Sequence, residues 1–355
     1  MHWPRSVQQR LSITIPAATL VKIALFVLLV VIAVKLWPVM IMIIIAALVA
    51  VMVDPVVEWL ARHRVRRALG ITLVALVMFG VLAAFLIIIV PMTVAQMRDL
   101  GKELPRIVQD FSRRVPAAAP LLTPLLEFSK RPPNTSQLQP LLTRGLLASR
   151  YALTGLTVTI LTVVISIYLL VEGKRAVEWL IVFARLRYRN KLRRTLKEVR
   201  PIVFAYMRGQ AITCCLCGGM ALTTLTLLHI PAAVPLAVLA FVADLVPVIG
   251  TIVMIIPAVL LAFAVSPLKA LIVLVVYLAY HLTESYWIIP RVYGRQMRLS
   301  TLTVLLAVTV GGVLQGAIGA VLILPFVAAY PVIEELWLAP RLGDTVDEHE
   351  RIEER

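Results

Sequence analysis

Long apolar segments separated by short polar ones are the feature that most constrains the fold of this chain. A membrane-spanning helix needs roughly 20 predominantly apolar residues, and nearly every segment reaches that length with its flanks. They lie at 19–36, 39–53, 68–97, 146–171, 203–229, 233–264, 270–289 and 300–338. Within a bilayer, helices and closed barrels alone satisfy all their backbone hydrogen bonds, and no alternating strand pattern is present. The sequence therefore predicts an all-α polytopic membrane protein.

The composition agrees with this class. Of 355 residues, 61% are hydrophobic and 15% charged, whereas soluble domains carry about 25% charged residues. The net charge of +16 could indicate a nucleic-acid partner, but the basic residues fall mostly between apolar segments, where they set membrane topology. We therefore expect the lipid bilayer, and no nucleic acid, as a partner.

Three cysteines, Cys214, Cys215 and Cys217, lie within one apolar segment. At this spacing they point to different sides of a helix, and no His or acidic residue follows within a turn. Neither a disulfide nor a metal site is favoured, and we expect packing roles and no cofactor.

Loop charge predicts the topology. The segments 61–70 and 174–200 are strongly basic and belong in the cytoplasm, which places both termini there. Asp54, before Pro55, is expected to end the second helix. The 174–200 segment is either a helix on the inner membrane surface or a solvated connector. The predicted division is an N-terminal membrane region (1–97), an extracytoplasmic segment of short amphipathic helices (98–145), a helix with a basic cytoplasmic segment (146–202), a region with two broken segments (203–338) and a charged tail (339–355).

Two apolar segments contain helix breakers. The segment 233–264 would be roughly 48 Å long as one helix, which exceeds a bilayer core of about 30 Å, and it is interrupted by "PVIG". The segment 300–338 is interrupted by "GGVLQGAIG". Such paired discontinuous helices are typical of transporters. The expected breaks and hinges are Pro247, Gly250, Pro257, Pro290, Gly311, Gly312, Gly316, Gly319 and Pro325.

The basic loop 291–298 favours one arrangement of these segments. If 233–264 crosses the membrane fully, this loop lies outside, and if it is a re-entrant hairpin, the loop lies inside as the positive-inside rule requires. We therefore expect about six full transmembrane helices plus two re-entrant helical hairpins, with eight full spans as the alternative.

Several motifs resemble one known family. "YMRGQ" (206–210), "DLVPVIGTIVMIIPAVL" (244–260), "SPLKA" (266–270), "HLTESYWIIPRVYG" (281–294) and "VGGVLQGAIGAVLILPFVAAY" (310–330) together are similar to the autoinducer-2 exporter (AI-2E) superfamily of permeases. The likeness covers about 200–335 closely. The chain departs from the family pattern at His281 and Leu282, at Ser285 and Tyr286, and at Gln315, where the family usually has an aromatic residue.

The resemblance implies a transporter of the bacterial inner membrane. Relatives include exporters of autoinducer-2 and, in another branch, sodium or lithium/proton antiporters, and the family is reported to form homo-oligomers, with pentamers expected. The departures from the pattern imply that the specificity of this chain can differ from that of the exporters.

Polar residues inside apolar segments are the candidates for a substrate or ion pathway. Asp244 and Glu284 are acids within apolar segments, where an ionised side chain costs about 2.5–3.5 kcal/mol on insertion scales, so they either line a cavity or lie near an interface. His281 shares a helix face with Glu284, and Tyr206 shares one with Gln210. Gln315 completes the set, and no metal site is expected.

The sequence supports a non-enzyme. It contains neither a phosphate-binding loop of an ATPase nor the H-E-x-x-H motif of a metalloprotease. The first hypothesis is a secondary transporter that exports a small polar molecule such as autoinducer-2, with H⁺ or Na⁺ as the coupling ion. The alternatives are a sodium or lithium/proton antiporter and an oligomeric membrane channel or assembly protein without coupled transport.

Overall fold

The structure is a computed structural model that describes residues 17–114, 135–247, 249–293 and 301–338. Within these ranges the chain is helical and has no β-strand. The tail 339–355 and most of the loop 291–298 lie outside them. The helices are α1 (Ala17–Arg62), α2 (Arg67–Ala84), α3 (Val90–Arg114), α5 (Thr135–Val182), α6 (Leu186–Leu227), α7 (Ala233–Ala243), α8 (Ile249–Val265), α9 (Pro267–Thr283), α10 (Ile289–Tyr293), α11 (Thr301–Ala328) and α12 (Tyr330–Ile333), with π-helical turns η1 (Phe85–Ile89), η3 (Glu284–Ile288) and η5 (Glu334–Leu338).

Among the described residues, six helical stretches are by length and composition apolar enough to cross a membrane, and α11 is one of them. The helices α7 and α8 are apolar but shorter, with 11 and 17 residues. The prediction of an all-α polytopic membrane protein is thus confirmed, and the chain is a multi-pass membrane protein.

The first two predicted helices form one helix. The 46 residues of α1 continue through Trp37 and Pro38, between the apolar segments 19–36 and 39–53, and end at Arg62. Pro38 removes one backbone hydrogen bond, a loss that membrane helices tolerate. The chain divides into two units within α1, between Ile44 and Ile45. In the first unit every described side chain from residue 19 to Met40 is exposed, as expected for a surface that contacts lipid.

Asp54 lies inside α1 and does not end it. Its carboxylate forms an ion pair with Arg200 of α6, and Arg67 of α2 lies 3.9 Å away. Arg200 also contacts Glu58 at 3.1 Å, and Arg67 donates a hydrogen bond to the carbonyl of Leu170 in α5. Within the second unit, this charged cluster therefore joins four helices next to the apolar contacts of Val57, Ile71 and Leu170.

The segment 98–114 also differs from its prediction. We expected short helices broken at prolines, but α3 continues without interruption from Val90 to Arg114. Likewise, the first part of the basic 174–200 segment belongs to α5, which ends at Val182, and its remainder begins α6 at Leu186. Long helices thus extend from the membrane segments into both of these polar segments.

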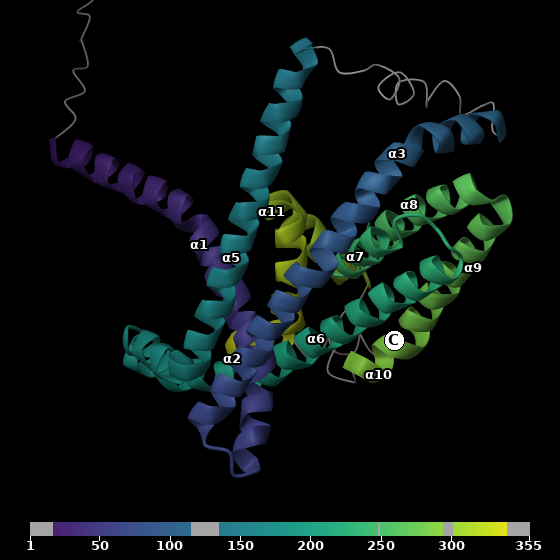
Figure 1. Cartoon of the computed structure of the whole chain (residues 1–355). Helices are drawn as coiled ribbons and strands as arrows, with labels where there is room; N and C mark the ends of the chain where they lie inside the picture. Colours follow the sequence, from purple (N-terminus) through teal and green to yellow (C-terminus); the bar gives the residue numbers. More distant parts are fainter. Residues whose placement is uncertain (1–16, 115–134, 248, 294–300, 339–355) are drawn as a thin grey trace, which may run out of the picture. The chain divides into compact units, whose positions relative to one another are not determined.

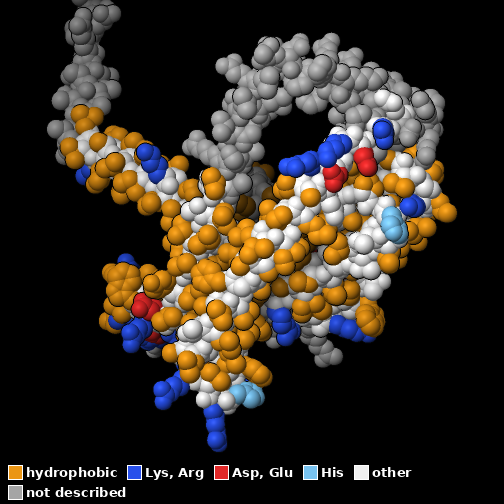
Figure 2. Space-filling model, viewed as in Figure 1, with side chains coloured by type: hydrophobic (Ala, Val, Ile, Leu, Met, Phe, Trp, Pro, Cys, Tyr) orange, Lys and Arg blue, Asp and Glu red, His pale blue; other side chains and the backbone are white. Residues whose placement is uncertain are grey.

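The main core lies where α6, α7, α8 and α9 pack together, and these four helices lie side by side in Figure 1. Its central positions are small: Ala221, Ala240, Ala258 and Ala262 are fully buried. Small residues let membrane helices approach closely, which is how this core is stabilised where lipid removes the usual hydrophobic drive. Most other hydrophobic side chains face outward, and they cover much of the face seen in Figure 2.

Candidate functional site

The first broken segment folds into two short helices joined by a turn. α7 ends at Ala243, and the turn is closed by hydrogen bonds from the Val246 amide to the Ala243 carbonyl (2.9 Å) and from the Gly250 amide to the Val246 carbonyl (2.8 Å). A Cβ atom at Gly250 would overlap the Ala243 carbonyl oxygen, so only glycine fits there. α8 then continues through Pro257, which interrupts no helix.

The second broken segment lies within α11. The backbone leaves helical geometry at Gln315 (φ −146°, ψ 22°) and Gly316 (φ 61°, ψ −148°). The conformation of Gly316 is essentially restricted to glycine. On either side of this break, Gly311 and Gly319 meet backbone to backbone, and a Cβ atom on either would overlap the other's carbonyl oxygen. The chain therefore reverses at Gln315 and Gly316, and the two halves of α11 pack together.

Other predicted breakers lie inside regular structure. Gly312 lies in the first half of α11 with open space around its Cα, and Pro325 lies in the second half, which continues to Ala328. Pro290 lies inside the continuous helical stretch Pro267–Val292, just after the π-helical turn η3.

The two broken segments meet at α6. Tyr206 of α6 is 4% exposed and belongs to a cluster with Val308, Ala320, Leu324 and Ala328, which come from both halves of α11. Val246, from the turn between α7 and α8, packs against the same cluster. One aromatic side chain of α6 is thus in the cluster that joins both segments.

Hydrogen bonds connect this junction to Asp244. The Tyr206 hydroxyl donates to Oε1 of Gln210 at 3.2 Å. Nε2 of Gln210 donates to the backbone carbonyl of Asp244 at 2.9 Å, and it lies 3.5 Å from Sγ of Cys214. Gln210 is 8% exposed, so its amide satisfies a carbonyl that the end of α7 leaves free. The broken segment is thereby fixed to α6.

The two predicted acids lie close enough to interact directly. Glu284 begins the π-helical turn η3 after α9 and is 7% exposed. Oδ2 of Asp244 is buried and has no hydrogen-bond partner among the described residues. Among the residues that the structure describes, neither Asp244 nor Glu284 forms an ion pair with Lys or Arg. The site therefore contains two neighbouring carboxyl groups without a compensating positive charge.

The two remaining predicted residues, His281 and Gln315, lie on different elements. Nδ1 of His281, one turn before Glu284, is 3.4 Å from the Thr251 hydroxyl of α8. Gln315 lies in the break of α11, and its Cβ is 2.8 Å from where a Cβ of Gly319 would be. Within the described ranges, no cluster of three or more His, Cys, Asp or Glu residues could hold a metal ion.

The structure adds polar residues that sequence reasoning missed. Thr213 is 3% exposed, interacts with Asp244, and its carbonyl accepts a hydrogen bond from Tyr280 at 3.4 Å. Cys214 and Cys217 are buried beside Asp244, and Sγ of Cys217 is 3.3 Å from Sδ of Met254. Thr213 follows Gln210 by three residues and so shares its helix face, a spacing that could have indicated it.

Comparisons with known proteins agree with this architecture. The sequence model described as AI-2E family transporter matches residues 21–339. "Putative transport protein YueF" of Bacillus subtilis (strain 168) is 26% identical over 83% of this chain and 82% of its own length. "Putative transport protein MT0215" of Mycobacterium tuberculosis (strain CDC 1551 / Oshkosh) is 27% identical over 81% and 80%. "AI-2 transport protein TqsA" of Escherichia coli (strain K12) is 25% identical over 79% and 81%.

Proposed function

This chain belongs to the AI-2E family of transporters, and from that premise we propose that it is a secondary transporter of the bacterial inner membrane, not an enzyme, that exports a small polar molecule. The observation that carries the proposal is the buried pair of Asp244 and Glu284 beside the junction of two broken segments. The name of one relative, AI-2 transport protein TqsA of Escherichia coli (strain K12), makes autoinducer-2 or a related metabolite the first substrate to test.

The acid pair supports coupling to protons. Two ionised carboxylates side by side in a buried site repel each other, so a proton shared between them lowers the electrostatic cost relative to two charges. Losing that proton adds a second negative charge beside the turn of α7 and α8 and beside η3. Since both elements have short, irregular backbones, this change of charge supplies a reason for them to move during transport.

The broken segments support an aqueous pathway. Backbone groups released at a break cannot face lipid, because each unsatisfied group costs several kcal/mol there. We propose that α7–α8 and α11 are re-entrant hairpins whose tips line the pathway, with helix ends offering partial charges to the solute. Homo-oligomers, with the pentamers that the family implies, would surround several such pathways.

A second candidate is a sodium or lithium/proton antiporter. The observation that favours it is Oδ2 of Asp244, a buried carboxylate oxygen without a hydrogen-bond donor among the described residues. Such an oxygen is a suitable ligand for a small hard cation.

Transport by purified protein in liposomes tests both candidates. We expect exchange of labelled autoinducer-2 against unlabelled solute, driven by a pH gradient and lost in Asp244→Asn and in Glu284→Gln. Glu172→Gln, which removes an exposed acid of α5, is the matched control and should transport normally. Unchanged transport in both site variants would contradict the role of the pair, and release without exchange would indicate a channel. Sodium- or lithium-dependent pH changes without solute transport would favour the antiporter.

Thiol labelling tests the topology that we propose, with both termini in the cytoplasm. An impermeant reagent applied to intact cells should not label Gln296→Cys or Ser6→Cys. Because α1 has no turn near Pro38, a single crossing by α1 would place the N-terminus outside, and labelling of Ser6→Cys alone would establish that arrangement. Labelling of Gln296→Cys would contradict the hairpin for α7 and α8.

A further inference from the structure

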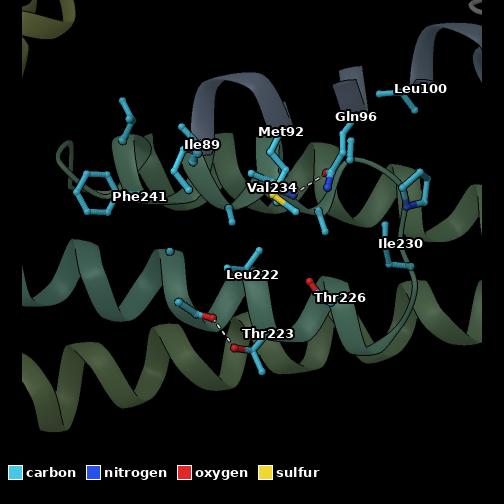
Figure 3. Close-up of a pocket in the computed structure, with 18 of the residues that line it drawn as sticks. Ile89, Met92, Gln96, Leu100, Leu222, Thr223, Thr226, Ile230, Val234 and Phe241 are labelled. Carbon is cyan, nitrogen blue, oxygen red and sulfur yellow. Dashed lines mark hydrogen bonds between the residues drawn. The ribbon is translucent and has the colours of Figure 1, made fainter. Parts of the chain in front are cut away.

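An open groove lies away from the acid pair, between α3, α6 and α7 (Figure 3). Its volume is about 1060 Å³, which is at the upper end of the range of about 300–1,000 Å³ for small-molecule sites. The polar carboxyl groups of Asp244 and Glu284 are not among its lining residues. The groove is therefore separate from the proposed transport site and can bind a different ligand.

The groove is apolar at one end and polar at the other. Figure 3 shows Ile89 and Phe241 toward one end, and Gln96, Leu100 and Thr226 toward the other. Along η1 and α3, its lining begins at the apolar Phe85 and ends at the acids Asp99 and Glu103, with steps of three or four positions except for Leu100. The lining thus changes from hydrocarbon to charge along a single helix face.

The polar end coincides with the ends of two membrane spans. The apolar stretch that includes α3 ends at Glu103, and the one that includes α6 ends at Leu227, next to His229 in the groove. At this end Oε1 of Gln96 accepts a hydrogen bond of 2.9 Å from the Val234 amide at the start of α7. The apolar part of the groove therefore lies at the depth of the acyl chains, and its polar end lies at the depth of the headgroups.

The polar end carries two acids and a histidine. Asp99 forms an ion pair at 3.1 Å with Lys102, which does not line the groove, and Glu103 has no ion-pair partner among the described residues. His229, just after the end of α6, belongs to the same lining. An ammonium group can pair with Glu103, while a ring N–H of His229 can donate a hydrogen bond to a phosphate.

We propose that this groove is a binding site for one phospholipid with a zwitterionic ammonium headgroup, such as phosphatidylethanolamine. Its acyl chains fill the apolar end, where the side chains of Phe85, Met92 and Leu222 are exposed. Its ammonium lies at Glu103 and its phosphate at His229. An anionic phospholipid lacks the ammonium and places its charge next to the acids, so it binds more weakly.

Lipid binding to the purified protein tests this site. Native mass spectrometry of delipidated protein titrated with phosphatidylethanolamine or phosphatidylglycerol of the same acyl chains should show tighter binding of the former. Glu103→Gln should weaken phosphatidylethanolamine binding about two- to fivefold, the range for a solvent-accessible ion pair, and leave phosphatidylglycerol binding unchanged or tighter. Glu172→Gln, outside the groove, should alter neither.

A substitution at Gly219 tests the apolar end of the groove. A Cβ at Gly219 meets no atom within 4 Å, so Gly219→Phe fills the groove without a clash and should remove the preference for phosphatidylethanolamine. Gly155→Phe, which is equally open but lies in α5 outside the groove, is the matched control.

The exposed Cys215 lines the groove and gives a second readout, since Cys214 and Cys217 are buried. Its alkylation rate should fall when phosphatidylethanolamine is added, and fall less with phosphatidylglycerol. Equal affinity for the two lipids, or a preference that survives Gly219→Phe, would overturn the site. A preference that survives Glu103→Gln would overturn the headgroup assignment.

Discussion

The reversal of α11 at Gly316 yields a prediction in which two neighbouring glycines should respond in opposite ways. Gly316 has φ 61° and ψ −148°, whereas Gly312 lies one turn earlier in regular helix. A Cβ atom at either position meets no atom within 4 Å. An added Cβ therefore clashes at neither position, and the two glycines differ only in backbone conformation.

The expected magnitudes follow from that difference. Gly316→Ala forces alanine into a backbone region that costs about 1–3 kcal/mol for a residue other than glycine. Gly312→Ala replaces glycine by the strongest helix former and should stabilise the helix by about 0.8–1.0 kcal/mol. The two variants should therefore differ by about 2–4 kcal/mol in free energy of unfolding, with the wild type between them.

Thermal unfolding in one detergent, with the wild type measured alongside, is the assay. We expect Gly316→Ala to lower Tm by several degrees and Gly312→Ala to leave it unchanged or raise it. A Gly316→Ala protein as stable as the wild type would refute the reasoning, because it would mean that the chain does not reverse at this glycine. Gly316→Asn should lose stability as well, since asparagine tolerates positive φ with ψ near +45° but not the ψ of −148° found here.

Further predictions concern the turn at Gly250, the three cysteines and two ion pairs. Gly250→Ala should lower Tm more than Gly316→Ala, since its Cβ would overlap the Ala243 carbonyl and the turn would have to move. In detergent, one thiol should react quickly with a maleimide and two slowly, and peptide mapping should identify the fast one as Cys215. Asp54→Asn should cost about 1–3 kcal/mol of stability because its mostly buried carboxylate loses the ion pair with Arg200, which then keeps only Glu58 among the described residues, whereas Glu178→Gln, at an exposed pair, should cost under about 1 kcal/mol in chemical denaturation.

Local composition predicted the interruptions of the fold well. "PVIG" indicated the turn between α7 and α8, and the glycines of "GGVLQGAIG" indicated the reversal of α11. Both turns need residues that lack a Cβ or an N–H group, and that requirement is visible in the sequence. Prolines alone were poor indicators, because Pro38 and Pro257 lie within continuous helices.

The site residues are brought together by helix packing, which local sequence patterns do not predict. Asp244 and Glu284 are 40 positions apart, and their meeting requires α8 and α9 to pack side by side. The hydrogen bond from Gln210 to the Asp244 carbonyl likewise joins residues 34 positions apart. The sequence indicated that each acid was unusual in an apolar segment, but it did not indicate that they form a pair.

The contact between Gly311 and Gly319 limits how α11 can take part in transport. Two backbones in direct contact on either side of a reversal cannot close further, and opening them would separate surfaces that no side chain could fill. The turn at the tip of this segment is therefore rigid, although glycines are usually associated with flexibility. Any movement of α11 that admits a solute must displace its two halves together as one rigid body, with hinges at the ends of the segment and not at its tip.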